Sequence, residues 1–277
     1  MTAKTPVSAR LRLSLAAAAV AVAAPAAAQE ARPETWGDAQ IVWLGEQHDN
    51  PAHHARQAEL VAALDPAALV FEMLTPDQAA RVTPALVADP EAMEAALGWE
   101  ESGWPDFSMY HPIFAAAPDA AIHGAAVPRE QARRVKDEGI AAVFGAEATR
   151  YGLTDPLTVA DSVAREALQM AAHCDALPAE MLPLMVDIQR LRDAALARAA
   201  LDALEDDGAP VVVITGNGHA RTDWGAPAAV ERVAPDVDQR ALGQGEDDTG
   251  PPQGSFDAVE ITAPVDRGDP CAAFAKP

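Results

Sequence analysis

The sequence predicts an α/β fold: a mainly parallel β-sheet flanked by helices, with a helical cap inserted between strands. Short runs rich in Val, Ile and Leu alternate along the chain with Ala-rich stretches of helical length, and this alternation is typical of parallel sheets. The apolar runs are continuous and bounded by turn residues, as expected for strands that are covered on both faces.

The first 28 residues have the order of a secretory signal peptide. Lys4, Arg10 and Arg12 precede an apolar run over residues 13–24, and small residues stand at 26–28, where cleavage is expected. The run is shorter than the ~20 apolar residues that a membrane-spanning helix needs. We therefore predict cleavage near residue 28, export to the periplasm, no integral membrane segment after cleavage, and a single domain over residues 29–277.

Each element of the predicted sheet and its helices has a local signal. Asn50 as N-cap and Pro51 at the first helical position indicate where the first helix begins. The long segment between the third and fourth strands forms the predicted cap, and GQGEDDTGPPQG is predicted as a flexible acidic loop. The predicted strands are residues 40–45, 68–73, 120–125, 210–215 and, as an edge strand, 256–262; the predicted helices are 51–64, 76–82, 91–97, 128–139, 160–173, 179–205 and 227–233.

Charge and missing motifs exclude several classes of function. The chain has 20 basic and 42 acidic residues, for a net charge of −22, which argues against binding nucleic acid through its phosphates. The sequence contains no Gly-x-Ser-x-Gly nucleophile elbow, and serine is scarce, so a serine hydrolase is disfavoured. It also contains neither glycine-rich phosphate-binding motif, so nucleotide binding lacks support.

The chain has two cysteines, Cys174 and Cys271. In an oxidising compartment such a pair favours a disulfide that ties the C-terminal tail to the middle of the domain. The alternative is two unpaired thiols. Metal binding by the pair is disfavoured because the two lack a close Cys-x-x-Cys spacing.

The candidate functional residues follow the strands at their carboxyl ends, where parallel sheets bind ligands. Glu46 and His48 follow the first strand, Glu72 lies near the end of the second, and Asn217 and His219 follow the fourth. Both histidines complete a Gly-x-x-His sequence, so two imidazoles and two carboxylates could share one crevice. There they could bind a metal ion or perform acid–base catalysis. The alternative is that each histidine caps a helix or bonds backbone carbonyls.

Other polar residues are further candidates for ligand binding. His53 and His54 lie on the first helix, where they either line a ligand or form a solvated face. Arg129 stands near a helix start and could pair with a ligand carboxylate or with Glu72. Tyr110 belongs to an aromatic segment that either walls an apolar pocket or packs the cap onto the sheet.

An ordered set of short sequences resembles the ChaN-like haem-binding uptake family, whose superfamily also contains Tiki-type metalloproteases and erythromycin esterases. The resemblance implies an α/β fold, export and a role in haem or iron acquisition, with haem held between two protomers and ligated by a tyrosine; this chain has Tyr110 and Tyr151. Family members are described as lipoproteins, and this chain lacks the lipobox cysteine, which implies a free periplasmic relative. The matching sequences are GEQHDNPAHHARQ (45–57), FEM (71–73), VPRE (127–130), QRLRDAALA (189–197) and ITGNGHAR (214–221).

Two functions follow as hypotheses. In the first, the protein is a periplasmic haem- or iron-binding protein that takes part in uptake, with haem as its small-molecule ligand, and forms a homodimer. In the second, it is a hydrolase that uses a divalent metal ion or an activated water. Glu46 would then be the base or a ligand, with His48 and His219 as metal ligands or proton shuttles. The resemblance implies the same three positions, because they match residues that carry catalytic or metal chemistry elsewhere in the superfamily.

Overall fold

The strands of the described chain pair into one six-stranded sheet, in the order β3-β2-β4-β1-β5-β6, and each of the paired strands runs parallel to its neighbour. The computed structural model describes residues 1–2, 33–268 and 271–272. Most of the predicted signal peptide, with its cleavage site, lies outside the described residues. The α/β prediction is confirmed. The strands are β1 (Ile41–Glu46), β2 (Ala68–Phe71), β3 (Ala121–Gly124), β4 (Val211–Gly216), β5 (Gln239–Glu246) and β6 (Ala258–Thr262).

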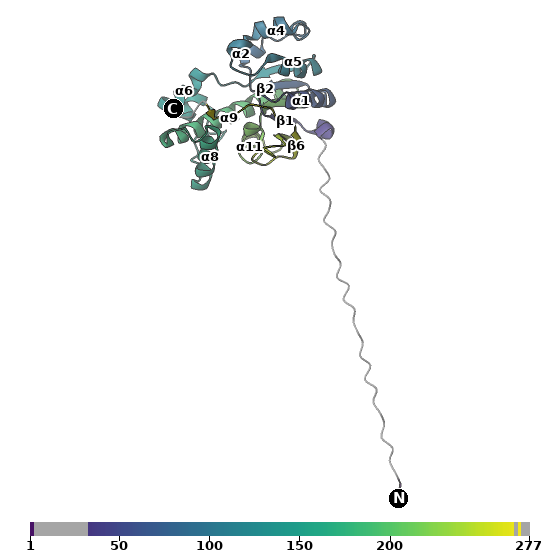
Figure 1. The fold of residues 1–277 in the computed structure, drawn as a ribbon, viewed down its shortest axis with the longest axis vertical. Helices are drawn as coiled ribbons and strands as arrows, with labels where there is room; N and C mark the ends of the chain where they lie inside the picture. The colour runs from purple at the N-terminus through teal and green to yellow at the C-terminus, as the bar shows by residue number, and fades with distance from the viewer. Residues whose placement is uncertain (3–32, 269–270, 273–277) are drawn as a thin grey trace. The chain divides into compact units, whose positions relative to one another are not determined.

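Helices cover both faces of this sheet (Figure 1). As predicted, a long helical segment, α6 to α9, lies between the third and fourth strands in sequence. The helices are α1 (Pro51–Leu64), α2 (Pro76–Ala79), α3 (Pro84–Val87), α4 (Pro90–Leu97), α5 (Phe107–Ala116), α6 (Arg129–Glu138), α7 (Ile140–Phe144), α8 (Val159–Ala172), α9 (Leu182–Asp206), α10 (Asn217–Ala220) and α11 (Ala226–Val233), with 3-10 turns η1 (Pro33–Asp38), η2 (Trp99–Glu101) and η3 (Ala179–Met181).

Alternation along β1 divides the core into two layers. Val42 and Leu44 lie in the cluster that contains residues of α1 and α5. Ile41 and Trp43 lie in the cluster that contains residues of α7, α9 and α11. All four side chains are fully buried, because successive residues of a strand point to opposite faces and both faces are covered. The carboxyl edge of the sheet is therefore where polar side chains can reach solvent.

The prediction of a loop over residues 243–254 is wrong at its start, because β5 continues to Glu246. Glycine-rich sequence disfavours a strand by propensity. Here the strand instead needs glycine: a Cβ on Gly245 would lie 2.3 Å from the carbonyl oxygen of Gly250. The edge-strand prediction for residues 256–262 is confirmed in β6, which ends the sheet.

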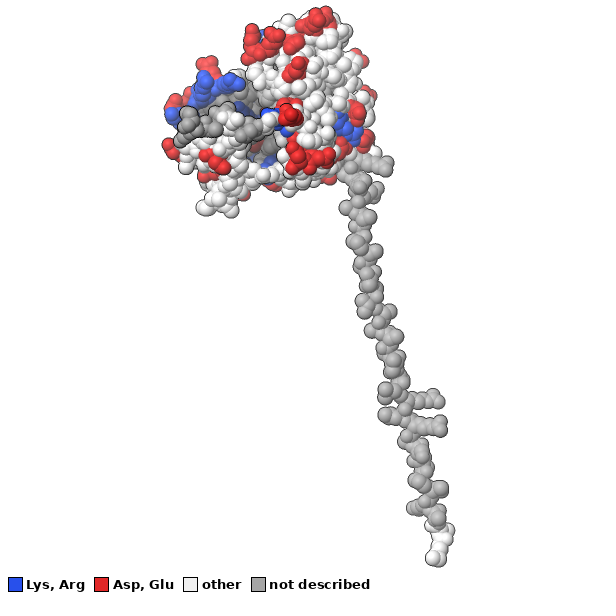
Figure 2. Space-filling model, in the orientation of Figure 1, with Lys and Arg blue, Asp and Glu red and all other residues white. Residues whose placement is uncertain are grey.

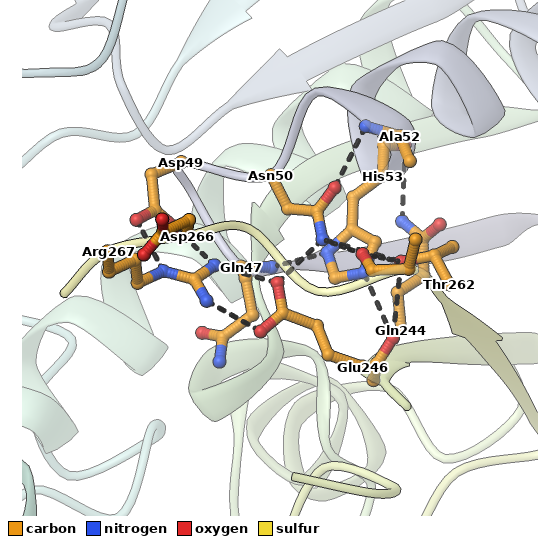
Figure 3. Close-up of polar contacts among 12 residues, drawn as sticks. Gln47, Asp49, Asn50, Ala52, His53, Gln244, Glu246, Thr262, Asp266 and Arg267 are labelled. Carbon is orange, nitrogen blue, oxygen red and sulfur yellow. Dashed lines mark hydrogen bonds and ion pairs between the residues drawn. The ribbon is translucent and has the colours of Figure 1, made fainter. Parts of the chain in front are cut away.

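The segment that follows β6 returns to the carboxyl edge of the sheet and is fixed there by Arg267. Its guanidinium donates to both carboxylate oxygens of Asp49 and of Glu246, at 2.6–2.7 Å (Figure 3). Asn50, the predicted N-cap, accepts from the backbone N–H of Ala52 and donates to Glu246 at 2.6 Å. The loop before α1 is thus joined to Arg267 both directly, through Asp49, and through the buried carboxylate of Glu246.

A disulfide joins Cys174, just after α8, to Cys271, as predicted. Among the described residues, no helix combines the length and apolar character needed to cross a membrane. Figure 2 shows acidic side chains spread widely over the face in view, as the net charge of −22 leads one to expect.

Candidate functional site

A cavity of about 550 Å³ opens at the carboxyl ends of β1, β2 and β4. Glu46, His48, Glu72 and His219 all line it, together with Asn217. Its volume is within the usual range of small-molecule sites, roughly 300–1,000 Å³. The crevice predicted from the strand ends is therefore present, and it brings together residues that lie up to 173 positions apart in sequence because parallel strands share one edge.

Glu46 and His48 form the first imidazole–carboxylate pair of the cavity. Nδ1 of His48 donates to Oε1 of Glu46 at 2.7 Å, and the imidazole ring lies edge-on to Trp104 at 4.9 Å. Burial alone would lower the pKa of His48, but the hydrogen bond to Glu46 and the charge of Glu72 raise it to about 9. His48 is therefore a cation at neutral pH, and about a third of its side chain is exposed.

Asp193 and His219 form the second pair. Nδ1 of His219 donates to Asp193 at 2.6 Å, and its Nε2 lies 3.6 Å from Oε1 of Glu72. Burial opposes protonation of His219, but Glu72 and Asp193 raise its pKa above the ordinary value. Two pairs thus flank Glu72, whose other oxygen accepts from Thr215 at 2.6 Å and from the backbone N–H of Gly216 at 2.8 Å.

Gly216 brings the two pairs close together. A Cβ at this position would lie 2.9 Å from Nε2 of His48, closer than real Cβ atoms approach a ring nitrogen. The last residue of β4 must therefore be glycine if the His48 ring is to lie against the strand.

We expect acid to destabilise the protein through Glu72. Burial would raise the pKa of Glu72, but His219, His48 and two hydrogen bonds lower it to about 2. The stability that this carboxylate contributes is fully present above its unfolded pKa, near 4.5, and is lost as the pH falls through 2. The contribution is roughly 3 kcal/mol at most. Urea unfolding between pH 6 and pH 2 would measure it.

Glu72→Gln is the matched control for that titration. The variant should be less stable than the wild type at neutral pH, with a free energy of unfolding that changes less between pH 5 and pH 2. Parallel curves for the two proteins would show that Glu72 does not titrate with a lowered pKa.

Two further candidates, His53 and His54, do not line this cavity. His53 and His54 are fully buried and, instead of forming a solvated face, they bond the backbone. Nδ1 of His53 accepts from the backbone N–H of Gln47 at 2.9 Å, so its Nε2 carries the proton that it donates to Gly245 at 3.2 Å (Figure 3). His54 Nε2 donates to the backbone oxygen of His48 at 2.8 Å. Both histidines shape the β1–α1 loop.

The packing interpretation holds for Tyr110. It is fully buried in the core with the aromatic residues of α5, and its hydroxyl donates to Glu46 at 2.9 Å. Burial and the charge of Glu46 raise its pKa well above the ordinary value. Tyr151 packs against Phe144 in the other core cluster. Arg129 lines the cavity, but Glu72 bonds Thr215, Gly216 and His219 and not this arginine.

Asp193 is a site residue that sequence reasoning did not single out. It lies on α9 in a stretch of good helix formers, QRLRDAALARAALDAL. This stretch has six alanines and four leucines. A carboxylate among them, on a helix expected to face the core, is the signal that could have identified it, because a buried acid needs a partner. That partner is 26 residues away in sequence, so the pairing with His219 was not visible.

The structure lends no support to the predicted metal site at Glu46, His48 and His219. In the part of the chain that is described, no three His, Cys, Asp or Glu side chains are grouped so as to hold a metal ion. Glu46 and His219 each bond another side chain of the site instead.

Comparisons with known proteins agree with this fold. The family model described as haem-binding uptake, Tiki superfamily, ChaN matches residues 33–230. A structure entitled "Cofacial heme binding to ChaN of Campylobacter jejuni" is similar with a TM-score of 0.57 and 18% identity, over 75% of this chain and 82% of that one. The type III effector HopBA1 matches with a TM-score of 0.45 and 13% identity, over 84% and 92%. No curated protein matches this chain.

Proposed function

The chain belongs to the ChaN haem-binding uptake family of the Tiki superfamily, and on that premise we propose that it is an exported, periplasmic protein that binds haem for haem or iron uptake. The observation that carries the proposal is the match of the family model over residues 33–230. Haem would bind in the cavity at the carboxyl edge of the sheet.

The residues that line this cavity fit a haem. Met73, Trp104 and Leu196 supply apolar wall, as an apolar porphyrin requires. Arg129 and Arg192 line the same cavity without an ion pair in the described part of the chain, and guanidinium groups suit the two propionates. A bound haem would supply an iron that accepts an axial ligand from the protein.

His48 is the residue we propose for that ligand. Its Nδ1 is held by Glu46, which fixes the ring, and its Nε2 has no partner among the described residues. A carboxylate behind a ligating imidazole orients the ring and raises its basicity. Because His48 is a cation in the free protein, Nε2 would have to release its proton before it could bind the iron, while Nδ1 stays bonded to Glu46. Tyr110 is fully buried and bonded to Glu46, so a tyrosine ligand from α5 would require that part of the core to open.

Hemin titration followed by absorbance tests this proposal. The mature wild-type protein should give a saturable Soret shift, and His48→Ala should weaken hemin binding by at least about tenfold. His123→Ala is the matched control, since that imidazole pairs with Asp207 away from the cavity. No specific shift with the wild type would refute haem binding. Loss of affinity in Tyr110→Phe or Tyr151→Phe instead of His48→Ala would move the ligand to a tyrosine.

A second candidate function is hydrolysis, and the Asp193–His219 pair favours it. A buried carboxylate that orients an imidazole toward a cavity is the arrangement of a general base, here for a water molecule, and haem binding does not require it. Glu46 and His48 would then bind or polarise the substrate. The test is a panel of esters and peptides with the wild type and with Asp193→Asn, His219→Gln and Glu46→Gln; activity that survives all three substitutions would exclude these residues.

Two further parts of the proposal, export and self-association, are tested in cells and in solution. Fractionation of cells that express the full chain, with N-terminal sequencing of the product, tests cleavage near residue 28. Sedimentation of the mature protein with and without hemin tests the predicted homodimer.

A further inference from the structure

A second cavity, of about 450 Å³, lies beside the first one. Gln47, Gln189, Asn217 and Gly218 line both, so the two cavities share a wall. The second is enclosed by α8, α9 and the loop between β5 and β6. Asp193 lines this second cavity too, but neither the proposed haem site nor the proposed hydrolysis lies in it.

Arg165 of α8 lines this cavity as a cation that forms no ion pair with a carboxylate in the described part of the chain. Its Nε is buried, and among the described residues it donates to no hydrogen-bond acceptor. Its guanidinium carbon lies 4.8 Å from the ring centroid of Trp224, which stacks the group and fixes its plane. Burial lowers the pKa of Arg165, as expected for a charge that has lost water without gaining an ion pair.

The other charged groups that act on Arg165 already have partners; Arg190, for example, pairs with Asp187 at 3.2 Å. The guanidinium carbon of Arg221 also lies over the Trp224 ring, 3.7 Å from its centroid, and Asp223 neutralises this arginine through hydrogen bonds of 2.6 and 2.5 Å. Asp193 attracts Arg165 through space, but its hydrogen bond goes to His219 at 2.6 Å. Arg165 and Arg221 thus both contact the indole of Trp224. Arg221 is paired with Asp223, whereas Arg165 has no ion pair among the described residues and can donate to a ligand.

The rest of the cavity wall suits a small polar acid. Gln169 and Gln189 supply amides that donate and accept, and Leu168 and Val186 supply apolar wall. A planar guanidinium held against a ring matches the two oxygens of a carboxylate. On a chain with a net charge of −22, an anion would not collect here without a dedicated cation.

We propose that this second cavity is a carboxylate-binding site in which Arg165, stacked on Trp224, receives the carboxylate of an organic acid. The carboxylate has two sources. It belongs either to a separate small acid or to a propionate that reaches across the shared wall from a haem in the first cavity; the second source rests on the proposed function.

Arg165→Met tests the site, with Arg134→Met as the matched control because that exposed arginine pairs with Glu138 on α6. Calorimetric titration of the mature protein with citrate and with succinate is the first arm. Hemin and its dimethyl ester, in which the propionates are blocked, form the second. Removal of a charge-assisted contact should weaken binding by about tenfold or more.

Each outcome either supports the proposed carboxylate site or contradicts it. Weaker citrate or succinate binding in Arg165→Met alone indicates a separate acid, and it holds even if the protein binds no haem. Weaker hemin binding with unchanged ester binding indicates the propionate. If neither arm responds to Arg165→Met, the proposal is wrong. Because the substitution removes a half-buried charge that has no ion pair among the described residues, the melting temperature should not fall; a clear fall would assign Arg165 to structure.

Discussion

Replacing Glu46 with alanine is expected to lower the free energy of unfolding by about 3–5 kcal/mol, the range for breaking a buried charge pair by removing one partner. Glu46 is 1% exposed and connects three side chains. It accepts from His48 at 2.7 Å and from Tyr110 at 2.9 Å, and it lies 3.4 Å from Nδ1 of His54. Burial disfavours its charge, but His48 and His54 lower its pKa below the ordinary value.

The size of the effect follows from what alanine leaves behind. The buried Tyr110 hydroxyl would keep only its long contact with the backbone oxygen of His48, at 3.4 Å, and His48 would lose the hydrogen bond that raises its pKa. Urea unfolding measures the change in free energy. Glu46→Gln keeps an acceptor of similar volume and should cost clearly less. Equal losses in the two variants would mean that the volume of the side chain matters and its charge does not. NMR titration of His48 in Glu46→Gln should show a pKa below 9.

The sheet and the crevice could be predicted because they depend on local signals. A continuous apolar run such as VVVITG identifies a strand from its own residues, and the carboxyl edge of a parallel sheet is then a matter of topology. Glu46, His48, Glu72 and His219 were found in this way. The topology of the fold is enough to predict that these four side chains lie close together. It does not predict which of them form hydrogen bonds with one another.

The partners could not be predicted because they depend on long-range packing. His53 and His54 have the same local setting as residues of a solvated helix face, yet α5 and the end of β5 bury them. Asp193 and Arg165 lie on helices whose rotation against the sheet decides what they face. A single sequence gives the periodicity of a helix but not its partner. The polar residues that directly follow the strands, such as His219, could therefore be identified from the sequence, whereas their partners on the helices, such as Asp193, could not.

The double variant Cys174→Ser/Cys271→Ser should lower the free energy of unfolding by about 2–4 kcal/mol, the typical contribution of a disulfide. The bond spans 97 residues, and a cross-link over so long a loop removes much freedom from the unfolded chain. The disulfide also restrains the native state, because Cys174 directly follows the loosely packed helix α8. None of the side chains of α8 is buried, so little apolar contact holds that helix to α9.

Urea unfolding and amide hydrogen exchange test both effects of the disulfide. The variant should unfold at lower urea, and the amides of α8 should lose more protection than those of β1, whose residues are buried throughout. Reduced wild-type protein is the matched control and should behave like the variant. Since Arg165 lies on α8, loosening this helix should also weaken the carboxylate site while leaving the His48 cavity intact. Uniform loss of protection in α8 and β1 would mean that the disulfide acts only through the unfolded state.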